Sequence, residues 1–580
     1  MSSCQRSTRL FKLFKTMPRN HSRAALIFLT VMLLGIAPSN AHGETRFVDL
    51  SLLVASDYPC TWPQAWPLFQ LNHHRVIGPL SAYNVDTLSL DPNTGTQMDT
   101  PPHSIPPPGS GLPYEAPSGV LFTEKIPAWQ FCGEACVVDI RALLGKAPLG
   151  HSPLVQQPHI EAWEKAHRPL RFGDVLLLRS NYSDLYYKPF PEGRKFLIDC
   201  LEKTAPGYPD PHPSCLEYVA SKGVMHMGTD SPSMGTLPTL MNETHVAGLK
   251  HGGIFTEGAT GLSALPSTGA FYCMMGPKHV GGAYGEGRAF AIVGAPLAHR
   301  LIESARNKRA LDLSVSLDGN LPVWWPGRGV GKHRQPYYRV NFSYAATIDY
   351  HHNTHLMDSQ TGTHLVTPAY ALPPPGFDNS QYSPEVRRWL TQYETAYGAR
   401  GTSDVTAEKV PISQTCGPAR VIDVSHLVGT TNRRTWPASP EITVDVLKKA
   451  ETQGGPFRPG DIVIFSSGHN DRHFRPLPEG VACFEDPLNG KSEGWPAPGA
   501  DAIVYLANKG VRCVATDAPT IGGVDPRRAL MTYWALGTKE MVAVEFLIRA
   551  AEIPQNAYFL FAAIKIRGSH GSPGWAICLY

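Results

Sequence analysis

One stretch decides the fold: Asn93-Thr94-Gly95-Thr96-Gln97-Met98-Asp99-Thr100-Pro101-Pro102-His103, because a diverged copy of it occurs later in the chain. The copy is Gln360-Thr361-Gly362-Thr363-His364-Leu365-Val366-Thr367-Pro368-Ala369-Tyr370, and the constant offset continues into the prolines that follow. Polar side chains around Gly-Thr, ending in Pro-x-His, are typical of a metal and acid–base site. The second copy has lost most of those side chains. We therefore interpret the chain as a duplicated enzyme domain whose halves have diverged.

The duplication extends well beyond this stretch. Matching pairs are Val137–Ile140 with Val421–Val424, Gly173–Leu178 with Gly460–Phe465, and Thr229-Asp230 with Thr516-Asp517. Apolar β-branched runs such as Val175–Leu178 predict buried strands, and Trp163–His167 and Val444–Lys449 predict helices before such strands. We therefore expect a mixed α/β class, with a first domain over 42–298, a solvated basic linker over 299–309 and a second domain over 310–580.

Composition places the chain among globular proteins. It has 580 residues, 42% of them hydrophobic and 17% charged, with a formal net charge of +3. No basic run or stripe stands out, so we expect no nucleic-acid partner. Glycine and proline, 53 of each, favour many turns and long loops over a helical bundle.

The N-terminus is typical of an export signal. Basic residues at 19–23 precede an apolar stretch over 24–37 and a small-residue cleavage position near Ala41. The alternative is a membrane anchor, but the apolar stretch is shorter than the ~20 residues that span a bilayer. We therefore predict a signal peptide over 1–41, translation from Met1 or Met17, and a periplasmic or extracellular protein without a stable anchor.

Export permits disulfides among the cysteines that follow the signal. The local candidates for pairing are Cys132 with Cys136 and Cys200 with Cys215. The first spacing also occurs in zinc sites, but no second Cys or His pair accompanies it. A disulfide and free thiols both remain open.

These motifs resemble the cyclase family that includes bacterial kynurenine formamidases and isatin hydrolases. The family hallmark is His-x-Gly-Thr-His-x-Asp-x-Pro-x-His, followed later by a His with a Glu twelve residues on, here His245 and Glu257. The resemblance implies a swivelling β/β/α-like fold in each half. Because family members commonly form homodimers, it also implies that the two halves pack as an intrachain pseudo-dimer.

Carried over position by position, the resemblance assigns metal ligation to Asp99, His245 and Glu257 and acid–base catalysis to His103. The two remaining ligand positions hold Asn93 and Gln97, whose amide oxygens are weaker candidates that shift preference from Zn²⁺ toward Mn²⁺ or Mg²⁺. The corresponding positions of half two are Gln360, His364, Val366, Tyr370, Tyr533 and Glu545. Since Val366 cannot ligate, we expect the second site, with Gln360, His364 and Glu545 as its remnants, to be degenerate.

The implied reaction is metal-assisted hydrolysis of a carbon–nitrogen bond in an amide, formamide or cyclic amide. The commonest family inference is arylformamidase activity, which converts N-formylkynurenine to kynurenine and formate in tryptophan catabolism. The expected cofactor is one divalent ion, Mn or Zn with Mg as a further option. The alternative is a non-catalytic descendant that binds a small molecule, because two of the usual imidazoles are gone. One feature separates the enzyme from the binding protein: in the enzyme, Asp99, His245 and Glu257 converge on one point, with His103 within reach.

Overall fold

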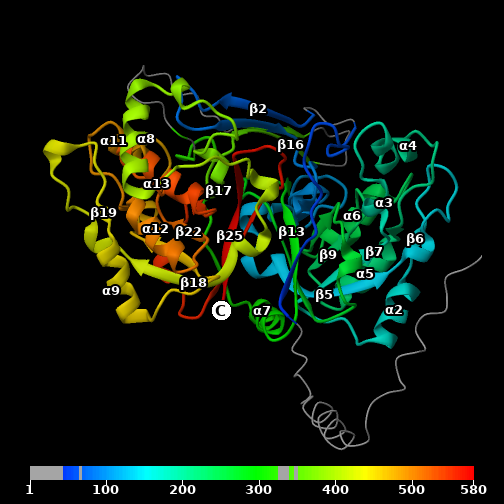
Figure 1. Cartoon of the computed structure of the whole chain (residues 1–580). Helices are drawn as coiled ribbons and strands as arrows, with labels where there is room; N and C mark the ends of the chain where they lie inside the picture. Colours follow the sequence, from blue (N-terminus) through cyan, green and yellow to red (C-terminus); the bar gives the residue numbers. More distant parts are fainter. Residues whose placement is uncertain (1–43, 64–67, 324, 326–338, 345–350) are drawn as a thin grey trace, which may run out of the picture. The chain divides into compact units, whose positions relative to one another are not determined.

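Each half of the chain builds one large mixed sheet (Figure 1). Corresponding strands have corresponding neighbours in the two sheets. The structure is a computed structural model that describes residues 44–63, 68–323, 325, 339–344 and 351–580. The predicted signal peptide over 1–41 lies outside the described residues. Residues 45–580 form one unit, within which both halves can be compared directly.

The sheet of half one has nine strands in the order β1-β13-β11-β5-β7-β9-β10-β4-β12. The central strands β5, β7, β9 and β10 are parallel, and the remaining pairs are antiparallel. β12 and β13 are separated only by Gly287, yet they pair at opposite ends of the sheet, so the sheet curls on itself. The strands are β1 (Arg46–Asp49), β4 (Gln97–Asp99), β5 (Cys132–Asp139), β7 (Asp174–Arg179), β9 (His226–Thr229), β10 (Ile254–Glu257), β11 (Ala270–Met275), β12 (Tyr284–Glu286) and β13 (Arg288–Val293).

The sheet of half two has eight strands in the order β14-β25-β17-β23-β22-β20-β18-β24. Its last strand, β25, also pairs with β24, so this sheet closes through one long strand where half one has β12 and β13. The strands are β14 (Ala310–Asp312), β17 (His364–Val366), β18 (Cys416–Asp423), β20 (Ile462–Ser466), β22 (Cys513–Thr516), β23 (Val542–Glu545), β24 (Tyr558–Ala563) and β25 (Gly571–Leu579). The mixed α/β class and the repeat are thus confirmed.

Helices cover the sheets in each half. In half one, α5 packs on α6, and in half two α12 packs on α13. The helices predicted at Trp163–His167 and Val444–Lys449 are confirmed as parts of α2, which ends at Ala166, and α9. The helices are α2 (Gln157–Ala166), α3 (Tyr182–Tyr186), α4 (Ile198–Leu201), α5 (Pro213–Ser221), α6 (Met241–Leu249), α7 (Leu297–Arg306), α8 (Pro384–Tyr397), α9 (Val444–Gly454), α10 (His469–His473), α11 (Glu485–Leu488), α12 (Ala500–Asn508) and α13 (Pro526–Thr538).

A separate four-stranded sheet joins the two halves. Its order is β15-β16-β3-β2, so β16 of half two pairs with β3 of half one. This antiparallel pairing sets His355 opposite Leu90 and Asp358 opposite Thr87. The strands are β2 (Gln70–Arg75), β3 (Val85–Leu90), β15 (Arg339–Tyr344) and β16 (His351–Asp358); β2 and β16 lie along the upper edge of Figure 1. Two short parallel pairs also repeat between halves: β6 (Leu154–Val155) with β8 (Asp210–Pro211), and β19 (Glu441–Ile442) with β21 (Ala497–Pro498).

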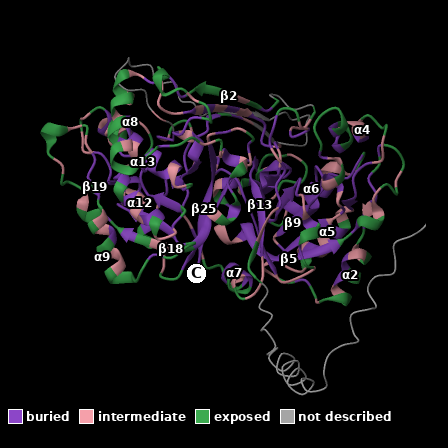
Figure 2. Ribbon diagram, in the orientation of Figure 1, coloured by how far each residue is buried: buried purple, intermediate pink, exposed green. Residues whose placement is uncertain are grey.

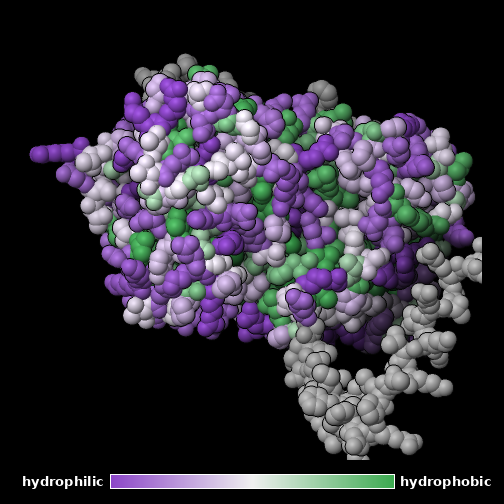
Figure 3. Space-filling model, in the orientation of Figure 1, coloured by the Kyte–Doolittle hydropathy of each residue, from purple (hydrophilic) through white to green (hydrophobic). Residues whose placement is uncertain are grey.

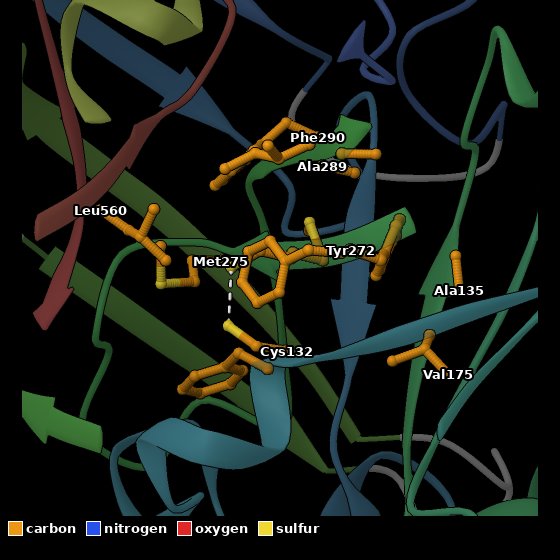
Figure 4. Packing of buried hydrophobic residues seen from close by; sticks show 14 of the residues in the cluster. Cys132, Ala135, Val175, Tyr272, Met275, Ala289, Phe290 and Leu560 are labelled. Carbon is orange, nitrogen blue, oxygen red and sulfur yellow. Dashed lines mark hydrogen bonds between the residues drawn. The ribbon is translucent and has the colours of Figure 1, made fainter. Parts of the chain in front are cut away.

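The hydrophobic cores of the halves also merge. One cluster contains Tyr272 and Phe290 of half one together with Leu560 and Trp575 of half two. Figure 4 shows Leu560 beside the residues of half one, and Figure 2 shows buried residues running through both sheets. Burial of apolar area at ~25 cal/mol per Å² favours this association. The halves therefore pack against each other within one chain, as the pseudo-dimer prediction requires.

The expectation of a solvated linker over 299–309 is wrong. Most of this segment belongs to α7, whose residues Leu301, Ile302 and Ala305 are buried against the cluster that the two halves share. The basic residues misled the sequence analysis because the helical period places apolar side chains on one face and charges on the other. Arg306 is itself tied to Glu134 and Asp174 of half one.

Of the two options left open for the cysteines, the described residues show free thiols: all ten of their cysteines are free and buried. Cys132 and Cys136 are four residues apart on β5, and this extended spacing of roughly 13 Å cannot be bridged. Cys132 instead lies opposite Cys273 on β11, with the two sulfur atoms 3.1 Å apart (dashed line in Figure 4).

No described helix has the length and hydrophobicity needed to cross a membrane. On the face drawn in Figure 3, hydrophobic residues form small scattered patches among hydrophilic ones.

Candidate metal-binding active site

The Gly-Thr pair of the repeated motif fixes the backbone that leads into the site. Gly95 has φ +74°, and a Cβ atom there would lie 2.7 Å from Val54 Cγ2. The Thr96 hydroxyl donates to the Gly258 carbonyl at 2.7 Å and accepts from the Leu52 amide at 2.9 Å. A residue other than glycine would be strained at this φ, and the threonine ties β4 to the end of β10.

Sheet register then brings the first carboxylates together. β4 lies between β10 and β12, with Glu257 opposite Gln97 and Tyr284 opposite Asp99. Residues two apart on a strand share a face, so Gln97 and Asp99 point to the same side. Both Asp99 and Glu257 are buried.

His245 reaches these carboxylates from α6. Its Nε2 atom lies 3.6 Å from Asp99 Oδ2 and 3.4 Å from Glu257 Oε1. Its Nδ1 atom lies 2.8 Å from the Met241 carbonyl. The carbonyl accepts a hydrogen bond from Nδ1–H, so Nε2 is the nitrogen that points at the carboxylates and the atom with which this imidazole would bind a metal.

His103 comes from the 3₁₀ turn Pro101–His103 directly after β4 and is buried. Ligand atoms of Asp99, His103 and His245 all lie within 4.8 Å of one another. The His103 ring is 5.4 Å from the His245 ring and 4.5 Å from the Tyr284 ring. The structure thus brings together four predicted residues: His103 groups with Asp99 and His245, and Glu257 contacts His245.

The donor set fits a divalent cation. Both carboxylate oxygens of Asp99 are buried and accept no hydrogen bond from any described residue. The 3.4 and 3.6 Å separations at His245 exceed ordinary hydrogen bonds of about 2.7–3.2 Å. Tetrahedral ligands at ~2.0–2.2 Å from an ion lie roughly 3.3–3.6 Å apart. Asp99, His103, His245 and Glu257 could therefore hold such an ion.

Electrostatics supports the same assignment. Burial, together with the charge of Glu257, raises the pKa of Asp99 to about 7. Although burial alone would lower it, interactions with Asp99 and Glu257 raise the pKa of His245 to about 10. Without an ion, a protonated His245 compensates the carboxylates; a bound cation would take over that role and displace the proton from Nε2.

Asn93 and Gln97 take a different role. Gln97 Nε2 donates to Asn93 Oδ1 at 2.7 Å and to Glu257 Oε2 at 2.6 Å. The side-chain nitrogen of Gln97, which is no ligand, therefore faces the site. These two residues hydrogen-bond each other and orient Glu257.

Half two repeats the framework with fewer donors. Gly362 has φ +60°, and Thr363 donates to the Phe546 carbonyl at 2.8 Å. His364 Nε2 lies 3.2 Å from Glu545 Oε2, while the Tyr533 hydroxyl donates to Glu545 at 2.6 Å.

Aromatic rings fill the rest of this second site. The Tyr370 ring lies 5.0 Å from the Tyr533 ring and stacks at 5.0 Å on Tyr83, which half one contributes. Gln360 and Val366 supply no further charged donor. Among the described residues, the second site thus offers His364 and Glu545 as charged or imidazole donors beside tyrosine rings, and its degeneracy stays a prediction.

Two further groups of potential ligands were not singled out by the sequence analysis. They are His73, Asp86 and His570, and His279, Glu286 and His355, each with ligand atoms within 4.8 Å. Both groups join residues of the two halves, so the pattern within one half could not reveal them. The charged pair Glu286 and Arg288 within an apolar segment was the available signal.

The chain is similar to several isatin hydrolases. The isatin hydrolase of Roseibium aggregatum is 27% identical over 201 residues, which cover 33% of this chain and 67% of that protein. Two solved structures are isatin hydrolase A from Labrenzia aggregata, bound to benzyl benzoate, and isatin hydrolase A from Ralstonia solanacearum. The first has 21% identity, a TM-score of 0.36 and coverage of 46% of this chain and 99% of that one. The second has 20% identity, a TM-score of 0.36 and coverage of 48% and 100%.

The family model described as "Putative cyclase" matches this chain twice, over residues 48–236 and 311–522. Together the two matches cover more than half of the chain, one in each half. The chain therefore belongs to the putative cyclase family, as two tandem copies.

Proposed function

We propose that half one is a metal-dependent hydrolase of a carbon–nitrogen bond in a small amide, with a cyclic amide as the first substrate class. The observation that carries the proposal is Asp99: its two buried carboxylate oxygens accept no hydrogen bond from a described residue, and Oδ2 lies 3.6 Å from His245 Nε2. The isatin hydrolase relative supports the cyclic amide, since isatin is one. Formamides, including N-formylkynurenine, are the second class.

In this proposal Asp99, His245 and Glu257 hold the ion, which when bound lowers the pKa of water and polarises the scissile carbonyl. His103 carries the proton, because its ring lies in the same group and an imidazole titrates near neutral pH. It takes the proton from water and gives it to the leaving nitrogen. Gln97 holds Glu257 in place through its 2.6 Å hydrogen bond.

Half two supports half one in this proposal. Tyr83 of half one stacks on Tyr370 of half two, and Asp86 of half one contacts His570 of half two. In the other direction, His355 of half two contacts Glu286 beside the site of half one. Each half thus completes the surroundings of the other. We further propose that the mature chain is exported after cleavage near Ala41.

The test compares two matched variants at the same sheet register, Glu257→Gln in half one and Glu545→Gln in half two. The mature protein is loaded with Mn²⁺ or Zn²⁺ and assayed for ring opening of isatin and deformylation of N-formylkynurenine. We expect turnover by the wild type and by Glu545→Gln, and little by Glu257→Gln. A wild type that holds the ion but turns over neither class would leave the small-molecule-binding alternative.

A further inference from the structure

The buried group of His279, Glu286 and His355 lies on the boundary between the two halves. His279 and Glu286 belong to half one, where Glu286 ends β12, and His355 lies on β16 of half two. All three are fully buried. Glu286 stands opposite Gln97 across β12 and β4, so the group borders the hydrolytic site without sharing its ligands.

The distances in this group suit a metal ion, although the same atoms also make long hydrogen bonds, with His279 Nε2 3.3 Å and His355 Nδ1 3.4 Å from Glu286 Oε1. His279 Nε2 lies 3.3 Å from Glu286 Oε1, and His355 Nδ1 lies 3.3 Å from Glu286 Oε2. Both separations exceed the usual N–H···O range of about 2.7–3.2 Å. They match the roughly 3.3–3.4 Å between tetrahedral ligands bound at ~2.0–2.1 Å. The two imidazoles stack with ring centres 3.6 Å apart, so both present nitrogen atoms to one carboxylate.

A similar group in the same molecule shows what a saturated arrangement looks like. Asp86 lies 2.8 Å from His73 Nδ1 and 3.0 Å from His570 Nδ1, and it also accepts from the His570 amide at 2.7 Å. Hydrogen bonds alone account for this group. In the other group the hydrogen bonds to Glu286 Oε1 are longer, at 3.3 and 3.4 Å, and Glu286 Oε2 and His355 Nε2 are buried without a hydrogen-bond partner among the described residues.

Ligand type and burial favour a cation. The group offers one carboxylate and two imidazoles whose ligand atoms lie within 4.8 Å of one another, and all three side chains are fully buried. A carboxylate is costly to bury unless a positive charge compensates it.

We propose that His279, Glu286 and His355 form a second divalent-cation site, of the zinc type, that ties β16 of half two to β12 of half one. Two imidazoles and one carboxylate are the donors that zinc accepts, and water completes the shell. The ion stabilises the contact between the halves. This proposal does not depend on the proposed hydrolysis.

The experiment counts ions per chain by elemental mass spectrometry after loading the mature protein with Zn²⁺ and removing excess ion. We expect two ions in the wild type, one in Asp99→Ala and one in His355→Gln. The matched control is His570→Gln, which removes the histidine of the hydrogen-bonded Asp86 group and should keep two. One ion in the wild type that Asp99→Ala removes would overturn the proposal.

The design separates failure of this site from failure of the hydrolytic site. If the Asp99 site is empty and the His355 site is occupied, the wild type carries one ion. His355→Gln then loses this ion and Asp99→Ala keeps it. If His355→Gln does not fold, X-ray absorption at the zinc edge of Asp99→Ala identifies the ligands of the ion that this variant retains. Two imidazole ligands per ion support the proposal, and an ion without imidazole ligands, or no ion, overturns it.

Discussion

Half one and half two hold a glutamate at the same place in the sheet but surround it differently. Glu257 faces Gln97 and has His245 3.4 Å away, whereas Glu545 faces His364 and accepts a 2.6 Å hydrogen bond from Tyr533. The tyrosine hydroxyl satisfies the carboxylate that an imidazole and a cation would otherwise share. The comparison teaches that the same sheet position can hold a carboxylate beside an imidazole in one half and beside a hydrogen-bonding tyrosine in the other, without loss of the fold.

Both halves keep the same hydrogen bonds between an aspartate side chain and the backbone of a neighbouring loop. Asp230 accepts hydrogen bonds from the Ser180 hydroxyl and amide, and Asp517 does the same with Ser467. These aspartates pin the loop after β7 and the loop after β20. Since such contacts fix the backbone in both halves, the ligand positions could change independently.

The largest expected effect comes from removing half two. A chain that ends at residue 309 loses the β16 partner of β3 and the Leu560 and Trp575 side chains of the shared core. We expect it to be insoluble or unfolded, because the exposed sheet edge and apolar surface favour aggregation. Soluble yield and circular dichroism measure this. Coexpressed 310–580 serves as the rescue control, and a soluble, fully active monomer of half one would contradict the pseudo-dimer.

The next effect compares Asp99 with Val366, its counterpart in half two. Asp99→Ala should remove the ion from this site and lower kcat/KM by about a thousandfold, since a metal supplies several kcal/mol of transition-state stabilisation. Val366→Ala should leave metal content unchanged and activity within about twofold, because the site of half two takes no part. Equal losses in both variants would mean that half two contributes to catalysis.

The third comparison substitutes His103, the proposed proton carrier of half one, and Tyr370, which takes its position in half two. His103→Gln should lower kcat by about 10²–10⁴-fold, the usual contribution of acid–base catalysis, while the ion stays bound. Tyr370→Phe should change neither. Metal analysis beside kinetics decides the role. Loss of the ion in His103→Gln would instead make His103 a ligand.

Sequence reasoning reached the repeat and the convergence of Asp99, His245 and Glu257 because both depend on motifs within one half. The pairing of β4 with β10 is itself long-range, but the motifs that the family resemblance supplied already joined their residues. His279, Glu286 and His355 were missed because β16 crosses to β3 of the other half, a long-range pairing that no local period encodes. Helix α7 was missed for a different reason. Its basic residues were interpreted as a solvated linker, although its apolar residues lie on one face of the helix.

Stability without metal should differ between wild type and Asp99→Asn in a pH-dependent way. The pKa of Asp99 in the folded protein is about 7, above its ordinary value, so its ionisation opposes folding. Wild-type stability is then lost as pH rises from about 4 to about 7, and Asp99→Asn escapes this loss. We expect a gain on the order of 1–2 kcal/mol at pH 7, reduced because His245 loses a partner, and none near pH 4.

Unfolding in denaturant after chelation measures this difference. Val366→Thr, the corresponding buried position of half two, is the control for a polar change that should not depend on pH. A gain in Asp99→Asn that is the same at pH 4 and pH 7 would show that ionisation of Asp99 is not its cause.

The smallest effect tests whether half one can regain a ligand from the pattern of half two. Gln97→His places an imidazole where half two has His364, whose Nε2 lies 3.2 Å from Glu545 Oε2, so the sheet has room for it beside Glu257. We expect zinc affinity at the Asp99 site to rise about tenfold, because imidazole is a better zinc donor than an amide. Competition with a chelator measures the affinity, and Gln97→Asn is the matched control. If Gln97→His lowers the zinc affinity instead, the hydrogen bond from Gln97 to Glu257 contributes more to zinc binding than an imidazole at this position would.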